Sequence, residues 1–171
     1  MIIDRLNLEP LSFEGGYFRQ TWSSGGMVAG GTIAGGTIDG GTIAGGTAIY
    51  YLLTDEPESF SRMHKLPSDE LWHFYCGDPV ELLLLHPDGS GEVLILGSDI
   101  GDGQRPQIAV QAETWQGARI VPGIDNPAGY ALLGTTMFPG FQKDDFVPGD
   151  REELCVRYPA FADFVGKLVT R

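Results

Sequence analysis

The chain has 171 residues, 42% of them hydrophobic and 20% charged, which is enough to bury the core of one globular domain over residues 1–171. Eleven basic against 23 acidic residues give a net charge of −12, and such a surface repels phosphate backbones and anionic membranes. We therefore expect neither nucleic acid nor a membrane as a partner. The first residues form no basic and apolar leader, so we expect a cytoplasmic protein.

Short strand signals, separated by turns rich in Gly, Pro and Asp, run along most of the chain. Asp88-Gly89, between two apolar runs, is a typical hairpin turn. Helix is expected near the C-terminal end alone, over 151–157 behind an Asp150 N-cap and over 160–169. The expected strands are 16–22, 47–53, 59–66, 70–76, 80–86, 91–96, 107–110, 115–121 and 130–137. This pattern predicts an all-β barrel or sandwich with one or two short C-terminal helices.

Residues 25–46 form a glycine-rich insertion that repeats a five-residue unit: GGMVA, GGTIA, GGTID, GGTIA, GG. Glycine resists ordering, so a mobile loop is one interpretation. The other is a projecting hairpin that turns at Asp39-Gly40 and is held by a second copy of the chain, since its edges would be exposed. The expected cross-strand pairs are Thr37 with Thr42, Thr32 with Thr47, Ile38 with Gly41, and Ile33 with Gly46.

The most informative segment carries an imidazole, a carboxylate and a glycine turn at a fixed spacing: His64, five residues, Glu70, six residues, Gly77. Successive side chains of a strand alternate between its faces, so residues at steps of two from His64 and Glu70 share their face. The residues expected beside them are Phe60, Arg62, Trp72 and Phe74. A cation, an imidazole, a carboxylate and aromatic walls are typical of a small-molecule site. Alternatively, Glu70 forms a buried salt bridge with Arg62.

Three further residues could reach this cavity from strands later in the chain. Trp115 could form an aromatic wall or belong to the core. The amides of Gln107 and Gln116 could contact a polar ligand if they point inwards. His73 alternates to the face opposite Glu70, where we expect a structural hydrogen bond.

The spacing around His64 resembles the first motif of the cupin superfamily, which reads His-x-His, three or four residues, Glu, six residues, Gly. Here Arg62 stands in place of the first histidine, and the gap to Glu70 is five residues. In the second motif, Gln116 stands where the third histidine would be. The metal cage that the resemblance implies is thus reduced to His64 and Glu70, since arginine stays protonated and cannot be a ligand. We expect no metal cofactor; a divalent metal at His64 and Glu70 is the minor alternative.

Longer stretches are similar to the cupin family known as DUF985 or cupin-5. They cover residues 14–21, 48–53, 60–64, 68–75, 115–118 and 138–141. Two features depart from that family: the glycine insertion, and Gln111 and Glu113 where the family tends toward Pro and Gly. The resemblance implies a double-stranded β-helix (jelly-roll) barrel, a homodimer and an internal pocket. It also implies a likeness in shape to sugar-nucleotide epimerases, which use a histidine base and no metal.

Three functions follow as hypotheses. The leading one is a small-molecule-binding cupin whose pocket holds a polar, carbohydrate- or nucleotide-like ligand. The first alternative is a metal-independent sugar epimerase or isomerase, with His64 as general base, Glu70 raising its pKa and Arg62 holding an anionic group. The second alternative is a metal-dependent cupin oxygenase.

Overall fold

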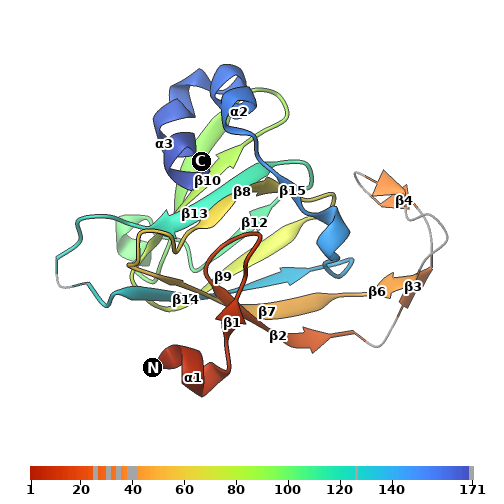
Figure 1. Ribbon diagram of the computed structural model, residues 1–171, viewed down its shortest axis with the longest axis horizontal. Coiled ribbons are helices and arrows are strands. Elements are labelled where there is room, and N and C mark those ends of the chain that lie inside the picture. The colour runs from red at the N-terminus through yellow and green to blue at the C-terminus, as the bar shows by residue number, and fades with distance from the viewer. Residues whose placement is uncertain (25–26, 30–31, 34–35, 38–41, 126, 170–171) are drawn as a thin grey trace.

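Two antiparallel sheets pack against each other in the computed structural model, which describes residues 1–171 except 25–26, 30–31, 34–35, 38–41, 126 and 170–171 (Figure 1). The six-stranded sheet contains, in spatial order, β1 (Glu9–Pro10), β2 (Tyr17–Ser23), β7 (Thr47–Thr54), β14 (Tyr130–Met137), β9 (Glu70–Gly77) and β12 (Gln107–Val110). The five-stranded sheet contains β11 (Gly91–Leu96), β10 (Val80–Leu85), β13 (Trp115–Ile120), β8 (Ser61–Lys65) and β15 (Val147–Pro148). This is the predicted all-β, jelly-roll architecture.

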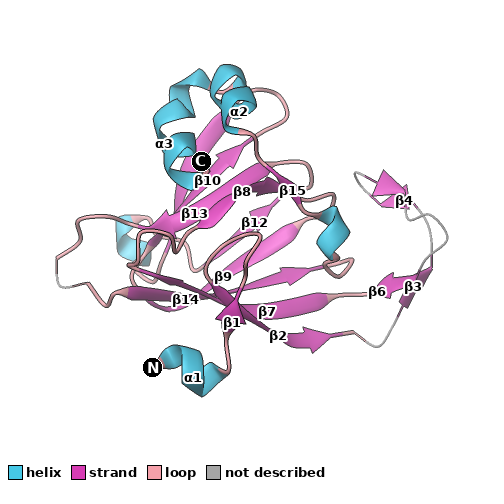
Figure 2. Ribbon diagram, in the orientation of Figure 1, coloured by secondary structure: helices cyan, strands magenta, loops and turns pink. Residues whose placement is uncertain are grey.

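All nine strands expected from the sequence are present, with ends within two residues of the predicted ones. The helices are short: α1 (Ile2–Leu6), α2 (Arg151–Arg157) and α3 (Ala162–Leu168), with single 3-10 turns at η1 (Ile100–Asp102), η2 (Lys143–Asp145) and η3 (Pro159–Phe161) (Figure 2). Asp150 caps α2 as predicted, because its carboxylate accepts the Glu153 N–H. The sequence did not reveal α1, β1 or β15, since two to five residues are too few to show a period.

Strand β10 is buried on both faces, which explains its continuous apolar run. Leu82 and Leu84 point into the core between the sheets. Leu83 and Leu85 point to the other side, into a second core beneath α2 and α3. The two helices lie over the outer face of the five-stranded sheet (Figure 1). The molecule therefore has three layers at this end: helices, five-stranded sheet and six-stranded sheet.

Part of the glycine-rich insertion forms paired strands beyond the ends of β2 and β7 (Figure 1). They are β3 (Met27–Ala29) with β6 (Thr42–Ala44), and β4 (Thr32–Ile33) with β5 (Gly36–Thr37). The predicted register is wrong: Thr32 pairs with Thr37, while Thr47 pairs with Ser23. A glycine-rich repeat offers several nearly equivalent registers, so the sequence does not specify one. The proposed Asp39-Gly40 turn and the Ile38–Gly41 pair lie outside the described residues.

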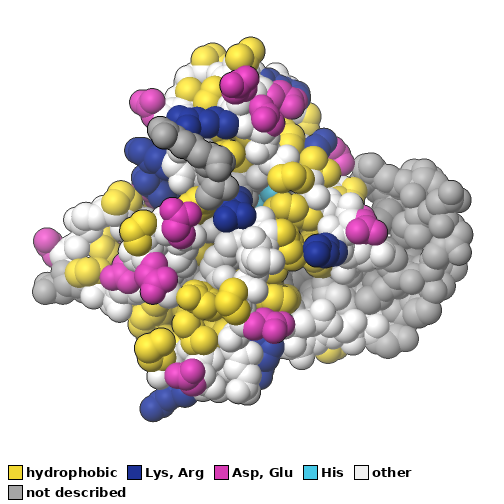
Figure 3. Space-filling view, viewed as in Figure 1, with side chains coloured by type: hydrophobic (Ala, Val, Ile, Leu, Met, Phe, Trp, Pro, Cys, Tyr) yellow, Lys and Arg dark blue, Asp and Glu magenta, His cyan; other side chains and the backbone are white. Residues whose placement is uncertain are grey.

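The surface agrees with the acidic composition. Acidic side chains are spread over the face shown in Figure 3, with hydrophobic and basic groups between them. Within the part of the chain that the structure describes, no helix is long and apolar enough to cross a membrane.

Helix α2 supplies a test of the outer layer. Leu154→Ala should lower the free energy of unfolding by about 2–5 kcal/mol, because Leu154 is 1% exposed beneath the helices. Val156 lies on the same helix and is 83% exposed, so Val156→Ala should change stability by less than about 0.5 kcal/mol. Urea unfolding followed by circular dichroism measures both variants. Equal effects would contradict the packing of α2 on the sheet.

Candidate functional site

A cavity of about 210 Å³ opens between the two sheets. Among the described residues that line it, most are apolar and three are ionisable: Glu14, His64 and Glu70. The apolar ones are Leu11, Phe13, Phe18, Ile49, Leu66, Met137 and Phe141, and the remaining polar ones are Gln20, Thr47 and Thr135. The sequence therefore located two of the three ionisable residues.

His64 is held in one defined state by its own strand. Its Nδ1 lies 2.7 Å from the backbone carbonyl oxygen of Arg62. A carbonyl oxygen can only accept, so Nδ1 carries the hydrogen, and in the neutral ring Nε2 holds the lone pair. The ring stacks on Phe146, with centroids 4.8 Å apart. Burial lowers the pKa of His64, against opposing effects from Glu70 and the Arg62 carbonyl, so the neutral form is favoured.

Glu70 is oriented by a relay of two hydrogen bonds that begins at Trp72. The Trp72 Nε1–H donates to Oε1 of Gln116 at 2.8 Å. Gln116 in turn donates from Nε2 to Oε2 of Glu70 at 2.7 Å. Because indole nitrogen is only a donor, it fixes which way round the amide lies. Burial raises the pKa of Glu70, as does nearby Glu14, while His64 and the hydrogen bonds from Thr135 and Gln116 lower it.

Glu14 is the site residue that sequence reasoning missed. It lies in the loop between β1 and β2, and its Oε1 accepts a hydrogen bond from Ser61 Oγ at 2.7 Å. The residue as a whole is half-buried, but its carboxyl group lies inside the barrel between Ser61 and Tyr51. Burial raises the pKa of Glu14 to about 7, while hydrogen bonds with Ser61 and Tyr51 act in the opposite direction.

A glycine turn brings Glu14 into the cavity. Gly15 has φ +112° and Gly16 has φ +65°, a region that residues with side chains rarely adopt. A Cβ on Gly15 would overlap the carbonyl oxygen of Phe60, so the loop can lie against the start of β8 only with glycine there. A carboxylate directly before Gly-Gly at a strand entry was the signal available in the sequence.

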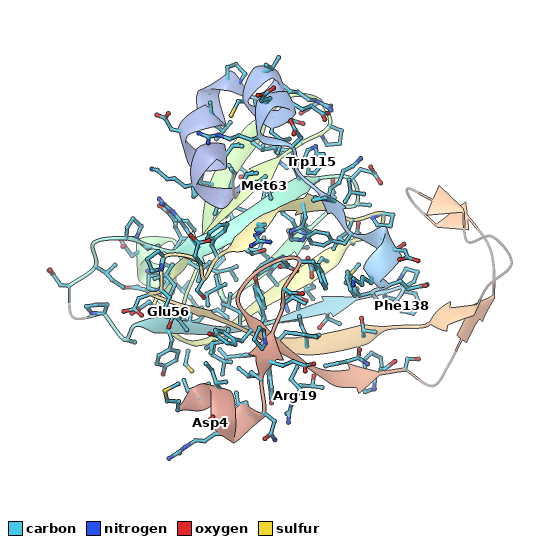
Figure 4. The ribbon with its side chains drawn as sticks, viewed as in Figure 1. Asp4, Arg19, Glu56, Met63, Trp115 and Phe138 are labelled. Carbon is cyan, nitrogen blue, oxygen red and sulfur yellow. The ribbon has the colours of Figure 1, made fainter. Side chains whose placement is uncertain are left out.

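A β-bulge in β8 changes the facing that simple alternation predicts. His64 lies opposite Gln116 and Ser61 opposite Ala118, so three steps on β8 match two steps on β13. Ser61 and His64 consequently both point into the barrel. The expectation that Phe60 shares the face of His64 is wrong, because Phe60 packs in the outer core beneath the helices. Met63 belongs to the same core (Figure 4).

Arg62 also lies away from the cavity lining. Its guanidinium donates to the backbone carbonyls of Ser12 and Phe13, at 3.4 and 3.5 Å. Its backbone N–H donates to the Glu14 carbonyl at 2.9 Å. Arg62 therefore fastens the loop that carries Glu14, and the carboxylate of Glu70 takes its hydrogen bond from Gln116 instead.

The other predicted contact residues fall into three places. Trp72 is in the core between the sheets, with Phe74 packed against that core. Trp115 belongs to the outer core beneath the helices (Figure 4). Gln107 is exposed on β12, 3.2 Å from Nδ1 of His73, and lines a separate surface groove. Gln116 is buried and hydrogen-bonded to Glu70. This placement does not support ligand contacts by Phe60, Trp115 or Gln107.

The donor set does not fit a tightly held transition metal. Among the described residues, no group of three or more His, Cys, Asp and Glu lies close enough together to bind one. At the third-ligand position, Gln116 turns its NH₂ group toward Glu70, and an amide nitrogen offers no lone pair.

A jelly roll that carries a histidine and a glutamate on facing strands of its interior defines the chain as a cupin. The particular family is the one described as Cupin superfamily (DUF985): its model matches residues 1–147, and the chain belongs to it.

Solved structures support this assignment. A hypothetical protein from Leishmania major is 28% identical, with a TM-score of 0.84 over 99% of this chain and 97% of that one. A protein from Shewanella oneidensis is 29% identical, with a TM-score of 0.81 over 99% and 95%. Oxalate decarboxylase from Bacillus subtilis shares the fold alone, at 8% identity and a TM-score of 0.53 over 96% of this chain and 38% of that one. No protein with a curated description matches the chain.

The relay to Glu70 predicts the effect of removing its central amide. Gln116→Met should lower the free energy of unfolding by about 1–3 kcal/mol, because the buried Trp72 N–H and a Glu70 oxygen both lose their partners. It should also raise the pKa of Glu70 further, as followed by ¹³C NMR of the carboxyl group. Gln107→Met removes an exposed amide and is the matched control. A loss of stability as large in the control would contradict the relay.

Glu14 predicts a pH dependence of stability. Its pKa is about 7 in the folded chain against 4.5 for an ordinary glutamate, so the stability it contributes at low pH is lost as pH rises between these values. Gln cannot titrate, so the stability of Glu14→Gln relative to wild type should increase by about 1–3 kcal/mol from pH 4.5 to 7.5. Urea unfolding across this range measures the difference, with the surface variant Glu113→Gln as the control for net charge. If the difference in stability between Glu14→Gln and wild type stayed constant with pH, the pKa of Glu14 would not be raised in the folded chain.

Proposed function

We propose that this cupin binds a small molecule, mainly apolar in character, in the cavity between its sheets. The observation that carries the proposal is the convergence of three ionisable side chains in a cavity whose other described lining residues are mostly apolar. Buried polar groups in folded proteins have hydrogen-bond partners, and His64 Nε2 is the ring atom left to meet a ligand once Nδ1 is bound to Arg62.

The size and lining of the cavity support a smaller and less polar ligand than the carbohydrate or nucleotide expected from the sequence. Its volume of about 210 Å³ is below the roughly 300–1,000 Å³ of sites for drug-sized molecules. Seven apolar side chains from several elements form its walls. A single ring or a short branched chain matches this space.

A second candidate is metal-independent proton transfer, as in an epimerase or isomerase. The tautomer of His64 favours it, because a neutral imidazole with its lone pair on Nε2 is ready to act as a base. Glu70 would stabilise the imidazolium formed, since the two residues interact electrostatically. The third hypothesis, a metal-dependent oxygenase, has no such support in the donor set.

Native mass spectrometry of the protein purified from its own source organism, with elemental analysis of the same sample, tests the binding proposal. We expect a copurified organic molecule that is lost in His64→Leu and retained in His86→Leu. His86 is the matched control because it lies next to the β10–β11 turn, away from the cavity. A tightly held metal at one per chain, with no organic molecule, would overturn the proposal.

A further inference from the structure

We propose that Glu14 acts as a hydrogen-bond donor in the cavity and that the ligand is an uncharged molecule with an apolar body and a hydroxyl group. This inference rests on the proposed binding function and names the class of ligand. A hydroxyl suits the polar groups present, because it donates to a lone pair such as that of His64 Nε2 and accepts from a carboxylic acid such as Glu14.

The charges around the cavity argue against an anionic ligand. The described lining residues include two carboxyl groups, Glu14 and Glu70, and no lysine or arginine. The guanidinium of Arg62, two residues from His64, donates instead to backbone carbonyls of the loop that carries Glu14. An anion would therefore lose its hydration and meet like charge without any compensating cation.

The contacts of Glu14 place its proton at one oxygen. Ser61 already donates to Oε1, so a proton on the carboxyl belongs to the other oxygen. The Tyr51 hydroxyl donates to the carbonyl of Gly15 at 3.0 Å and lies beside Glu14, whose pKa it lowers. In the cavity, a ligand hydroxyl can accept the proton on the other Glu14 oxygen. The titratable groups that interact with Glu14 from neighbouring strands are Tyr51 on β7 and Glu70 on β9.

A cationic ligand is the alternative that two carboxyl groups allow, but the protein already supplies donors to both. Glu70 accepts from Gln116 and Thr135, and Glu14 accepts from Ser61. The donors are neutral, and burial holds the pKa of each carboxyl above its ordinary value. With a pKa of about 7, Glu14 is mostly protonated below that pH, and an uncharged ligand leaves it so.

Four probes with one ring and different polar groups test the proposal: toluene, benzyl alcohol, benzoate and benzylamine. Binding is followed by NMR of the Met137 and Leu66 methyl groups, which line the cavity. At pH 6 we expect benzyl alcohol to bind about tenfold more tightly than each of the other probes. This is the gain expected from one or two net hydrogen bonds made by its hydroxyl group. Its affinity should fall several-fold from pH 6 to 8.5, as Glu14 loses its proton.

Two variants assign the effect to Glu14. Glu14→Gln keeps a neutral donor, so benzyl alcohol should bind it with an affinity that no longer changes between pH 6 and 8.5. Glu14→Leu should bind benzyl alcohol several-fold more weakly at pH 6 and should lose the preference for benzyl alcohol over toluene. Glu113→Gln, on the surface beside Lys65, should behave as wild type throughout.

The outcomes separate this inference from the function on which it rests. Benzoate or benzylamine binding as tightly as benzyl alcohol, or toluene equalling it, would overturn the ligand class while leaving the cavity a binding site. An unchanged pH profile in Glu14→Gln would overturn the role of Glu14. Failure of all four probes to bind the folded protein, toluene included, would overturn the proposed function itself.

Discussion

The burial of carboxyl groups in the barrel is the constraint around which this molecule is organised. A carboxylate removed from water loses several kcal/mol of hydration unless donors replace the water. Glu70 has such donors because Gln116 offers its amide hydrogen and Trp72 keeps that amide from turning over. The same requirement explains why an amide, and not an apolar residue, lies at position 116.

Two irregularities in the backbone create the site within an otherwise regular jelly roll. The bulge in β8 allows Ser61 and His64 to point inwards together, which alternation alone forbids. The turn at Gly15 and Gly16 presses the preceding loop against β8, where Ser61 meets Glu14. Arg62, within the bulge, binds the carbonyls of that loop from the outside. Loop and bulge therefore hold each other in place.

Much of the fold could be predicted from the sequence, because strands leave a local record in alternation and in the turns that end them. The ends of nine strands, the Asp150 cap and the inward position of His64 and Glu70 all follow from spacing along the chain. The inward position of Glu14 could not be predicted, since it depends on contact between a loop and a strand 47 residues away.

The bulge was missed for a related reason. An extra residue in one strand is visible only when the partner strand is known, and β13 lies about fifty residues beyond β8. The facing of Phe60 and Arg62 was therefore misjudged, although His64 itself was placed correctly. Gln116 was predicted to contact a polar ligand, and its role as a donor to Glu70 emerged only from the side-chain geometry.

The position of β8 and β13 between two cores has a mechanical consequence. His64 and Gln116 face the interior of the barrel, while Met63 and Trp115, their immediate neighbours in sequence, face the helices. The backbone N–H of Gly149, just ahead of α2, is also bonded to the Met63 carbonyl at 2.7 Å. Only one layer of backbone, that of β8 and β13, therefore separates the cavity from the core beneath the C-terminal helices. Any change in how the helices pack on this layer acts on the same backbone that positions His64 and Gln116.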